Sequence, residues 1–119
     1  MIKQDLCYVL NKKMLYGQGF VYLLKEDGDE ALYKIGVTKG DINARIKKLQ
    51  TGNGNKIRLI HSFLSDRPFK LEKMLHFKYR ENREEGEWFL LDKKEVDNFL
   101  NECQRLQEII NCLNDNPFF

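Results

Sequence analysis

A lone acidic side chain in a basic segment is the first candidate for chemistry in this sequence. Glu72 is the only Asp or Glu between positions 67 and 80, and Lys70, Lys73 and Lys78 surround it. Because Mg²⁺ keeps most of its water and needs only one or two protein carboxylates, Glu72 could hold a metal ion. The alternative is an ordinary ion pair with a lysine on the same helix.

Arg45 is the second candidate, because it lies at the edge of an apolar stripe. The stripe has i, i+4, i+7 spacing, typical of one helix face, and consists of Ile42, Ile46 and Leu49. A guanidinium at that edge could grip a phosphate through two hydrogen bonds. It could equally be a surface arginine that buries only its stem.

Three further side chains could take part in the same chemistry. Tyr22 lies in a strand-like segment, and a phenol acts as general base only when nearby cations lower its pKa. Lys34 is expected to supply such a charge, although a core tyrosine is also common in strands. His76 follows Glu72 by four residues, so it shares a helix face with that carboxylate. It could orient Glu72, contact a phosphate or assist proton transfer.

The motifs that carry these residues resemble the GIY-YIG nuclease superfamily. They are Val21-Tyr22-Leu23-Leu24, Tyr33-Lys34-Ile35-Gly36, Glu72-Lys73-Met74-Leu75-His76 and Glu87-Trp88-Phe89, in that order. The chain looks most like the phage and large-DNA-virus branch, and the resemblance covers residues 19–100. It implies a three-stranded antiparallel sheet flanked by helices, one divalent metal and cleavage of phosphodiester bonds.

The resemblance also implies a role for each candidate. Glu72 would hold Mg²⁺ (or Mn²⁺), Tyr22 would position or activate water, and Arg45 would stabilise the phosphate. Lys34 stands where the second motif of the family has a tyrosine, and His76 is a further catalytic candidate. The chain departs from the family at Leu49, where a Tyr or His is frequent. It also has no clear counterpart of a late asparagine, Asn82 being a poor candidate, while Glu87 could rank as a second acid.

The elements that must position these residues follow the order ββαβα(β)α, which predicts an α+β fold. Two strands, 20–24 and 32–37, form a hairpin, and a third covers 56–64. One helix begins at Asp41 as N-cap, and another begins near Pro68. Asp92 is expected to cap a long C-terminal helix, 92–115. We expect one domain, 1–119, with a short helix within an N-terminal segment, 1–16.

The charge distribution favours a polyanionic partner such as DNA. The 119 residues carry a net charge of only +2, but Lys34 to Arg80 contains twelve Lys or Arg against three acids. A basic stretch of this kind can face DNA or can simply be a solvated surface. The sequence lacks an apolar run of about 18 residues and an N-terminal signal peptide, so we expect a soluble, cytoplasmic protein with no membrane partner. Its three cysteines indicate free, buried thiols rather than disulfides.

The C-terminal helix carries an apolar seam that could make a homodimer. The seam, of heptad-like spacing, consists of Val96, Phe99, Cys103, Leu106, Ile110 and Leu113. A 22-residue helix is about 33 Å long, so part of Leu106, Ile110 and Leu113 is expected to be exposed in a monomer. The alternative is that the whole stripe packs within the molecule.

The sequence therefore leaves three hypotheses. The first is a metal-dependent DNA endonuclease, the second is a DNA-binding module of the same fold with weakened turnover, and the third is a dimeric regulatory protein. Retention of Tyr22, Arg45 and Glu72 favours the first, and Leu49 favours the second.

Overall fold

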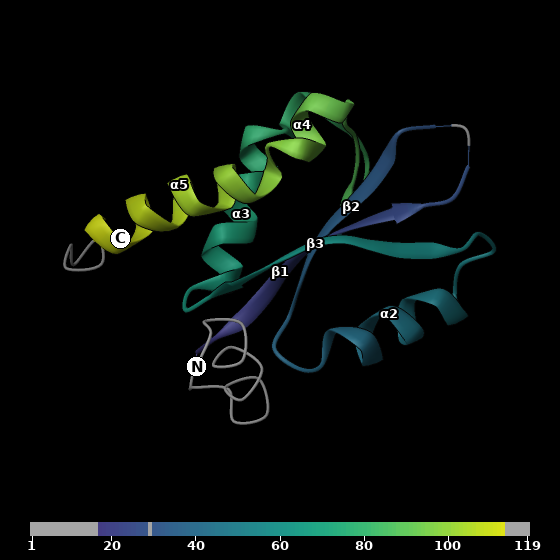
Figure 1. Cartoon of the computed structure of the whole chain (residues 1–119), viewed down its shortest axis with the longest axis horizontal. Coiled ribbons are helices and arrows are strands. Elements are labelled where there is room, and N and C mark those ends of the chain that lie inside the picture. The colour runs from purple at the N-terminus through teal and green to yellow at the C-terminus, as the bar shows by residue number, and fades with distance from the viewer. Residues whose placement is uncertain (1–16, 29, 114–119) are drawn as a thin grey trace.

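The computed structural model describes residues 17–28 and 30–113, and their fold is α+β, as predicted. The sheet elements and helices, in chain order, are β1 (Gly19–Glu26), β2 (Leu32–Thr38), α2 (Ile42–Thr51), β3 (Ile57–Ser65), α3 (Pro68–Lys78), a 3₁₀ turn η1 (Arg80–Asn82), β4 (Arg83–Glu85), β5 (Trp88–Leu90), α4 (Lys93–Asp97) and α5 (Phe99–Leu113). Figure 1 shows α3, α4 and α5 gathered beside one part of a twisted sheet and α2 beside another. The predicted short helix in 1–16 lies outside the described residues.

The sheet has five strands among the described residues, so the prediction of three was too few. Its order is β3-β1-β2-β5-β4, and every neighbouring pair is antiparallel. The hairpin β1–β2 and the third strand β3 are where the sequence placed them. The two extra strands form a short hairpin that extends the sheet beyond β2. Strand β5 corresponds to the optional strand of the predicted order. Strand β4 escaped prediction because all three of its residues are charged and exposed, which gives no alternating pattern.

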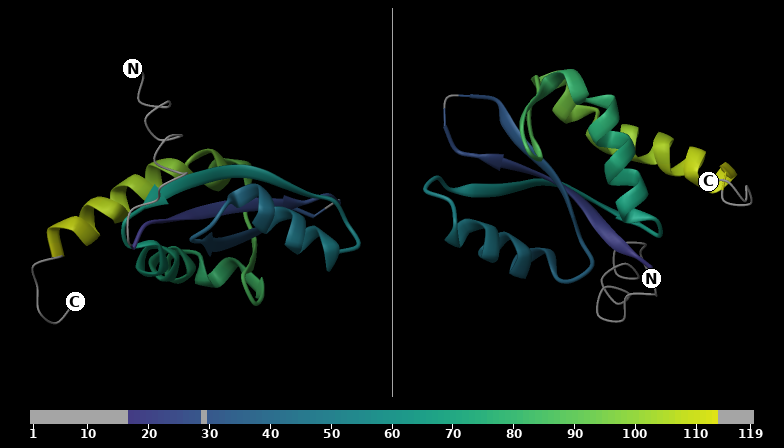
Figure 2. Two further views of the ribbon diagram at one scale, coloured as in Figure 1. Left: turned by 90° about the horizontal axis from the view of Figure 1, so that it is seen from below. Right: turned by 180° about the vertical axis from the view of Figure 1, so that it is seen from behind.

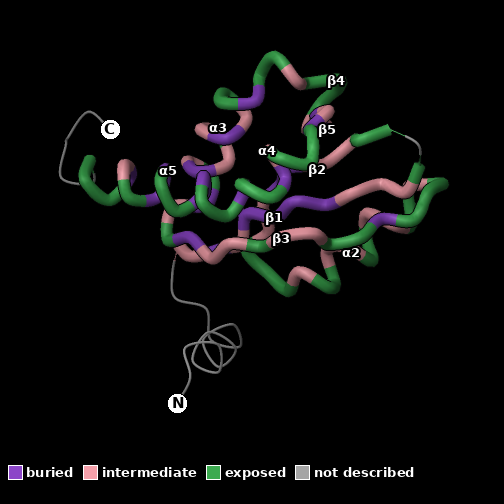
Figure 3. The backbone as a smooth tube through the Cα atoms, turned by 45° about the horizontal axis from the view of Figure 1, so that its top comes forward, coloured by how far each residue is buried: buried purple, intermediate pink, exposed green. Residues whose placement is uncertain are grey.

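Strand β1 lies at the centre of the molecule and is covered on both faces (Figure 3). Because side chains alternate along a strand, Val21 and Leu23 enter one hydrophobic cluster, while Tyr22 and Leu24 enter another. The larger cluster joins β1 and β2 to α3, α4, α5 and β5. The smaller cluster joins β1 and β3 to α2, and it contains Tyr22.

Helix α2 begins as the sequence predicts. The Asp41 side chain accepts a hydrogen bond from the backbone N–H of Asn43 at 3.1 Å, which caps the first turn. Ile46 and Leu49 pack against the smaller cluster. All ten residues of α2 remain at least partly exposed, so the helix covers the sheet without being enclosed by it.

The C-terminal segment corrects the prediction of one long helix. Asn98 ends α4 by donating its backbone N–H to the carbonyls of Lys94 and Val96, and its own carbonyl accepts from Glu102 as α5 begins. The two helices pack on the larger cluster, and α5 contacts α3, next to which it lies in the right-hand view of Figure 2.

The seam on these helices is buried within the molecule, which removes the reason given for a dimer. Leu106 and Ile110 were expected to be partly exposed, but they are buried in the larger cluster, and only Leu113 is exposed. Helix α5 packs across both α3 and β3, so these two elements cover the apolar seam that was expected to extend beyond the domain.

Two other sequence expectations concern cysteines and membranes. Cys103 is a buried free thiol as predicted, and burial raises its pKa to about 12. Cys112 is exposed, which corrects the prediction that it is buried, and Cys7 lies outside the described residues. Within the described part of the chain, every helix is too short or too polar to cross a membrane.

Candidate functional site

The centre of the candidate site is a contact between Tyr22 on β1 and Arg45 on α2. Arg45 Nε donates a hydrogen bond to the Tyr22 hydroxyl at 3.4 Å. Tyr22 pairs with Gly36 on β2, and a Cβ at that glycine would lie 2.5 Å from the tyrosine hydroxyl. A side chain at position 36 would therefore occupy the space of the phenol. The glycine of the Tyr-Lys-Ile-Gly motif is needed so that the ring can cross β2 and reach Arg45.

The hydroxyl of Tyr22 is a poor proton acceptor in this setting. Only 1% of the residue is exposed, and burial raises the pKa of the phenol. The hydrogen bond and positive charge of Arg45 oppose that rise, and the negative charges of Glu87 and Glu72 add to it. The expectation that Lys34 lowers this pKa is wrong, because the lysine is neutralised by another partner.

That partner is Glu87, which the turn between β4 and β5 places beside β2. Lys34 Nζ lies 3.2 Å from Glu87 Oε1 and 5.5 Å from the centroid of the Trp88 ring. Gly86 precedes Glu87 with φ +57°, a backbone conformation that glycine adopts without strain. The backbone carbonyl of Glu87 also accepts from the N–H of Ile35 at 3.1 Å, which ties the turn to the strand.

Glu72 reaches the same region from α3. Burial raises the pKa of its carboxyl group, and the negative charge of Glu87 raises it further. The charges of His76 and Lys34 lower it, but not enough to reverse the rise. Glu72 is therefore a half-buried carboxylate whose negative charge is not fully compensated by nearby positive charges.

His76 is fixed by a backbone contact through the same nitrogen that lies nearest Glu72. Its Nε2 atom lies 2.9 Å from the carbonyl oxygen of Ile35 and 3.9 Å from Glu72 Oε2. A carbonyl oxygen can only accept, so Nε2 carries the hydrogen and donates it. The ring also meets the Phe89 ring edge-on, with 5.0 Å between centroids. These contacts fix the His76 ring beside Glu72, where it adds positive charge when it is protonated.

The structure thus brings all five predicted residues into one electrostatically connected group. The group comprises Tyr22 on β1, Lys34 on β2, Arg45 on α2, and Glu72 and His76 on α3. The sequence analysis noted Glu87 as a second acid but did not place it among the site residues. Its ion pair with Lys34 depends on the β4–β5 turn, which the sequence pattern did not reveal.

The two departures from the family pattern have structural explanations. Leu49 packs against the cluster of Tyr22, so an apolar side chain at that position supports the phenol from below the sheet. Asn82 is engaged elsewhere, since its Nδ2 donates to the backbone carbonyl of Leu90 at 2.9 Å. It anchors the end of β5 and takes no part in the site.

A metal ion held by many protein ligands does not fit this part of the chain. Among residues 17–28 and 30–113, there is no group of three or more His, Cys, Asp or Glu side chains placed to hold one. A hydrated Mg²⁺, which needs only one or two carboxylates, does fit Glu72. A half-buried carboxylate with a raised pKa is one that gains from an added cation.

Three comparisons with known proteins complete the description. The family model of the T5orf172 domain matches residues 19–104, which span β1 to the first part of α5. No curated protein and no solved structure gives a match.

Proposed function

The chain belongs to the T5orf172 domain family, and from that premise and the geometry of the site we propose that it is a metal-dependent endonuclease that hydrolyses DNA phosphodiester bonds. The finer assignment, that the domain works as a GIY-YIG nuclease does, is part of this proposal. It is supported by the matching motifs around Tyr22, Lys34 and Glu72. The observation that carries the proposal is that Tyr22 and Arg45 lie near Glu72, a carboxylate whose negative charge its neighbours compensate only in part.

Arg45 is proposed to bind the scissile phosphate. Its guanidinium keeps a full positive charge, because contact with Tyr22 raises its pKa further. With one N–H directed at the phenol, four other N–H groups are available to phosphate oxygens. Positive charge placed where negative charge develops in the transition state speeds phosphoryl chemistry.

Tyr22 is proposed to position the attacking water rather than to deprotonate it. Its raised pKa keeps the phenol protonated near neutral pH, so the hydroxyl can donate to a water or a phosphate oxygen. Its acceptor lone pairs already face Arg45. The phenol is held rigidly by burial, which keeps the water and the phosphate in a fixed relative position.

Glu72 is proposed to hold Mg²⁺ or Mn²⁺ through its carboxylate and the water shell of the ion. When bound, such an ion would lower the pKa of a coordinated water and offset charge on the phosphate. His76, anchored on the Ile35 carbonyl, lies beside the Glu72 carboxylate with its Nε2 atom 3.9 Å from Oε2.

A second candidate function is a DNA-binding module with little or no turnover. The raised pKa of Tyr22 favours it, because a phenol that stays protonated is not a ready proton acceptor, and Lys34, paired with Glu87, does not counter that rise. Binding through Arg45 and the basic helices would remain. A homodimeric regulatory protein has lost its main support, since Leu106 and Ile110 are buried.

Nicking of supercoiled plasmid separates the two candidates. The endonuclease proposal predicts nicking with Mg²⁺ or Mn²⁺ and none in EDTA. Glu72→Gln is expected to reduce nicking by about a hundredfold or more, since it removes the carboxylate that holds the ion. DNA binding should persist in this variant, because loss of a negative charge does not weaken attraction to phosphate.

Lys93→Gln is the matched control for a change of one surface charge, because its ammonium lies on α4 and pairs with Asp97. It should nick as the wild type does. Equal nicking by Glu72→Gln and wild type would eliminate Glu72 as the metal-holding residue, and metal-independent DNA binding without nicking would favour the binding module.

A further inference from the structure

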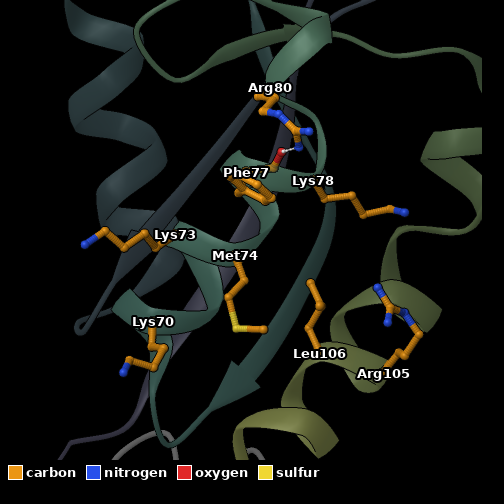
Figure 4. Close-up of a pocket in the computed structure, with 8 residues that line it drawn as sticks. All are labelled: Lys70, Lys73, Met74, Phe77, Lys78, Arg80, Arg105 and Leu106. Carbon is orange, nitrogen blue, oxygen red and sulfur yellow. Dashed lines mark hydrogen bonds between the residues drawn. The ribbon is translucent and has the colours of Figure 1, made fainter. Parts of the chain in front are cut away.

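A groove between α3 and α5 lies outside the group of Tyr22, Arg45 and Glu72. It has a volume of about 740 Å³, and its floor is apolar, formed by Met74, Phe77 and Leu106 (Figure 4). Five cationic side chains complete its lining, namely Lys70, Lys73, Lys78, Arg80 and Arg105. An apolar floor within a ring of positive charge calls for a ligand that is flat and apolar in one part and anionic in another.

The charged side chains that line the groove are all cationic. On the α5 side, Glu102 pairs with Lys78 at 3.4 Å and with Arg105 through a hydrogen bond. On the other side Lys70 and Lys73 extend from α3 (Figure 4). Because none of the eight lining residues is acidic, the net charge of the lining is positive.

Phe77 is the most distinctive residue of this groove. It is 66% exposed, an unusual position for a large aromatic side chain. The Arg80 guanidinium lies 4.1 Å from the centroid of its ring, and Arg80 Nη1 donates to the Phe77 carbonyl at 2.8 Å. Figure 4 shows the ring between Arg80 and Met74. Phe77 is thus a braced aromatic surface beside cations, the combination on which unpaired nucleobases stack.

The groove and the candidate site share helix α3 but lie on different faces of it. Glu72 and His76 form one i, i+4 row of α3, and Lys73 and Phe77 form another. From Glu72 to Phe77 the helix rises about 7.5 Å and turns about 140°. A strand whose phosphate lies at Glu72 would have to pass around α3 for a base further along it to reach Phe77.

We propose that this groove binds a single-stranded segment of nucleic acid, with a base stacked on Phe77 and phosphates on Lys73 and Arg80. This inference rests on the proposed function, because it extends the substrate of that site to DNA with an unpaired stretch. An acidic peptide is the competing ligand. It fits less well, because the floor offers only three apolar side chains, one of them the braced Phe77 ring, which is short of the repeated anchors that a helical peptide needs.

The test measures binding without cleavage. Fluorescence anisotropy follows a labelled 12-residue oligothymidylate in EDTA at fixed ionic strength. Loss of one stacked base weakens binding about five- to a hundredfold, so Phe77→Ala should have an effect in that range. Phe69→Ala is the matched control, since Phe69 is on the same helix, is 60% exposed and lies outside the groove. It should change affinity less than about twofold.

An abasic oligonucleotide of the same length separates stacking from charge. With this probe the effect of Phe77→Ala should vanish, while Lys73→Gln should weaken binding to both probes. Equal affinity of wild type and Phe77→Ala for oligothymidylate would overturn the proposal, as would equal losses in Phe77→Ala and Phe69→Ala. Phe77-dependent binding of an oligoglutamate peptide without such binding of oligothymidylate would also overturn it, in favour of the peptide.

The result is independent of nuclease activity. Glu72→Gln should show the same dependence of oligothymidylate binding on Phe77 as the wild type does, since it leaves the groove unchanged. If plasmid is nicked but oligothymidylate binding ignores Phe77, the groove proposal fails and the endonuclease proposal stands. If Phe77-dependent binding occurs without any nicking, the endonuclease proposal fails and the groove proposal stands.

Discussion

Two glutamates on neighbouring helices have opposite electrostatic environments. Glu102 on α5 is 5% exposed, yet a hydrogen bond from Arg105 and the charge of Lys78 hold the pKa of its carboxyl group below its usual range. Glu72 on α3 is less buried, but burial and the neighbouring charge of Glu87 raise its pKa. The more buried carboxylate, Glu102, is the one whose negative charge is compensated by neighbouring cations.

The difference separates a structural ion pair from the carboxylate on which the proposed metal site rests. Glu102 joins α3 to α5 through Lys78, and its charge is balanced within the protein. Within the described part of the chain, the side chains that lower the pKa of Glu72 are His76, 3.9 Å away and positive only when protonated, and Lys34, which also pairs with Glu87. A deficit of positive charge in a half-buried site is costly for the folded protein, and a bound cation would remove that cost.

The largest expected effect is that of Arg45→Ala on catalysis. This change should reduce plasmid nicking about a hundred- to thousandfold, equivalent to about 3–4 kcal/mol, because it removes the positive charge that is proposed to contact the scissile phosphate. The rate should fall more than DNA affinity if the guanidinium meets charge that develops in the transition state. Single-turnover cleavage and binding, measured side by side, provide both numbers.

Arg58→Ala is the matched control for that change. Arg58 lies on β3 and forms an exposed ion pair with Asp27 at 2.9 Å. Its loss should leave nicking within about twofold of the wild type, because exposed pairs contribute little. A drop of less than threefold in Arg45→Ala would remove Arg45 from the candidate site.

The second prediction concerns the glycine that admits Tyr22. In Gly36→Ala the new methyl group would meet the Tyr22 hydroxyl at 2.5 Å, and the buried ring has no free space into which to move. We expect a loss of about 1–3 kcal/mol in the free energy of unfolding, measured by urea denaturation, together with reduced nicking.

Gly40→Ala is its control, because the nearest atom to a Cβ there is Thr38 Oγ1 at 3.9 Å. Its free energy of unfolding should change by less than about 0.5 kcal/mol. If both alanine variants proved as stable as the wild type, the close approach of Tyr22 to β2 would be disproved.

The smallest expected effect is a difference in stability between the two glutamates. Glu102→Gln should lower the free energy of unfolding by about 1–2 kcal/mol at pH 7, since it weakens charge-assisted hydrogen bonds. Glu72→Gln should cost nothing at pH 7, because the ionised carboxylate is unfavourable in the folded protein. Equal losses in the two variants would contradict the distinction between them.

The pH dependence of that difference has a definite sign. The pKa of Glu102 is lowered by folding, so its stabilising contribution is present above the unfolded-state pKa and is lost as pH falls through the folded-state pKa. The gap between wild type and Glu102→Gln should therefore close in acid. The pKa of Glu72 is raised by folding, so the cost of its ionised form is present above the folded-state pKa and disappears as pH falls below the unfolded-state pKa.

Much of the fold could be predicted because its signals are local. The β1–β2 hairpin has two apolar runs around a polar turn, and Asp41 precedes an apolar stripe of helical spacing. Strand β4 could not be predicted, since Arg83–Glu85 is held by pairing with β5 rather than by its own pattern. The burial of Leu106 and Ile110 depends on how α5 packs against α3 and β3, a tertiary arrangement that the seam does not reveal.

The candidate site divides in the same way. Its residue types and order are visible in the sequence, and the structure places all five together. Their pKa shifts cannot be read from the sequence, because these depend on burial and on Glu87, which the β4–β5 turn places beside Lys34. The expected low pKa of Tyr22 was wrong for that reason.

The most direct test of the central claim is the titration of Glu72 itself, followed by the ¹³C chemical shift of its side-chain carboxyl group with and without Mg²⁺. Without the ion, Glu72 should titrate above the usual range for glutamate and above Glu102, in keeping with the directions of the two pKa shifts. With Mg²⁺ the pKa of Glu72 should fall, while that of Glu102 stays where it was. A Glu72 that titrates at the ordinary value, or that does not respond to Mg²⁺, would contradict the claim that this carboxylate is placed to hold a metal ion.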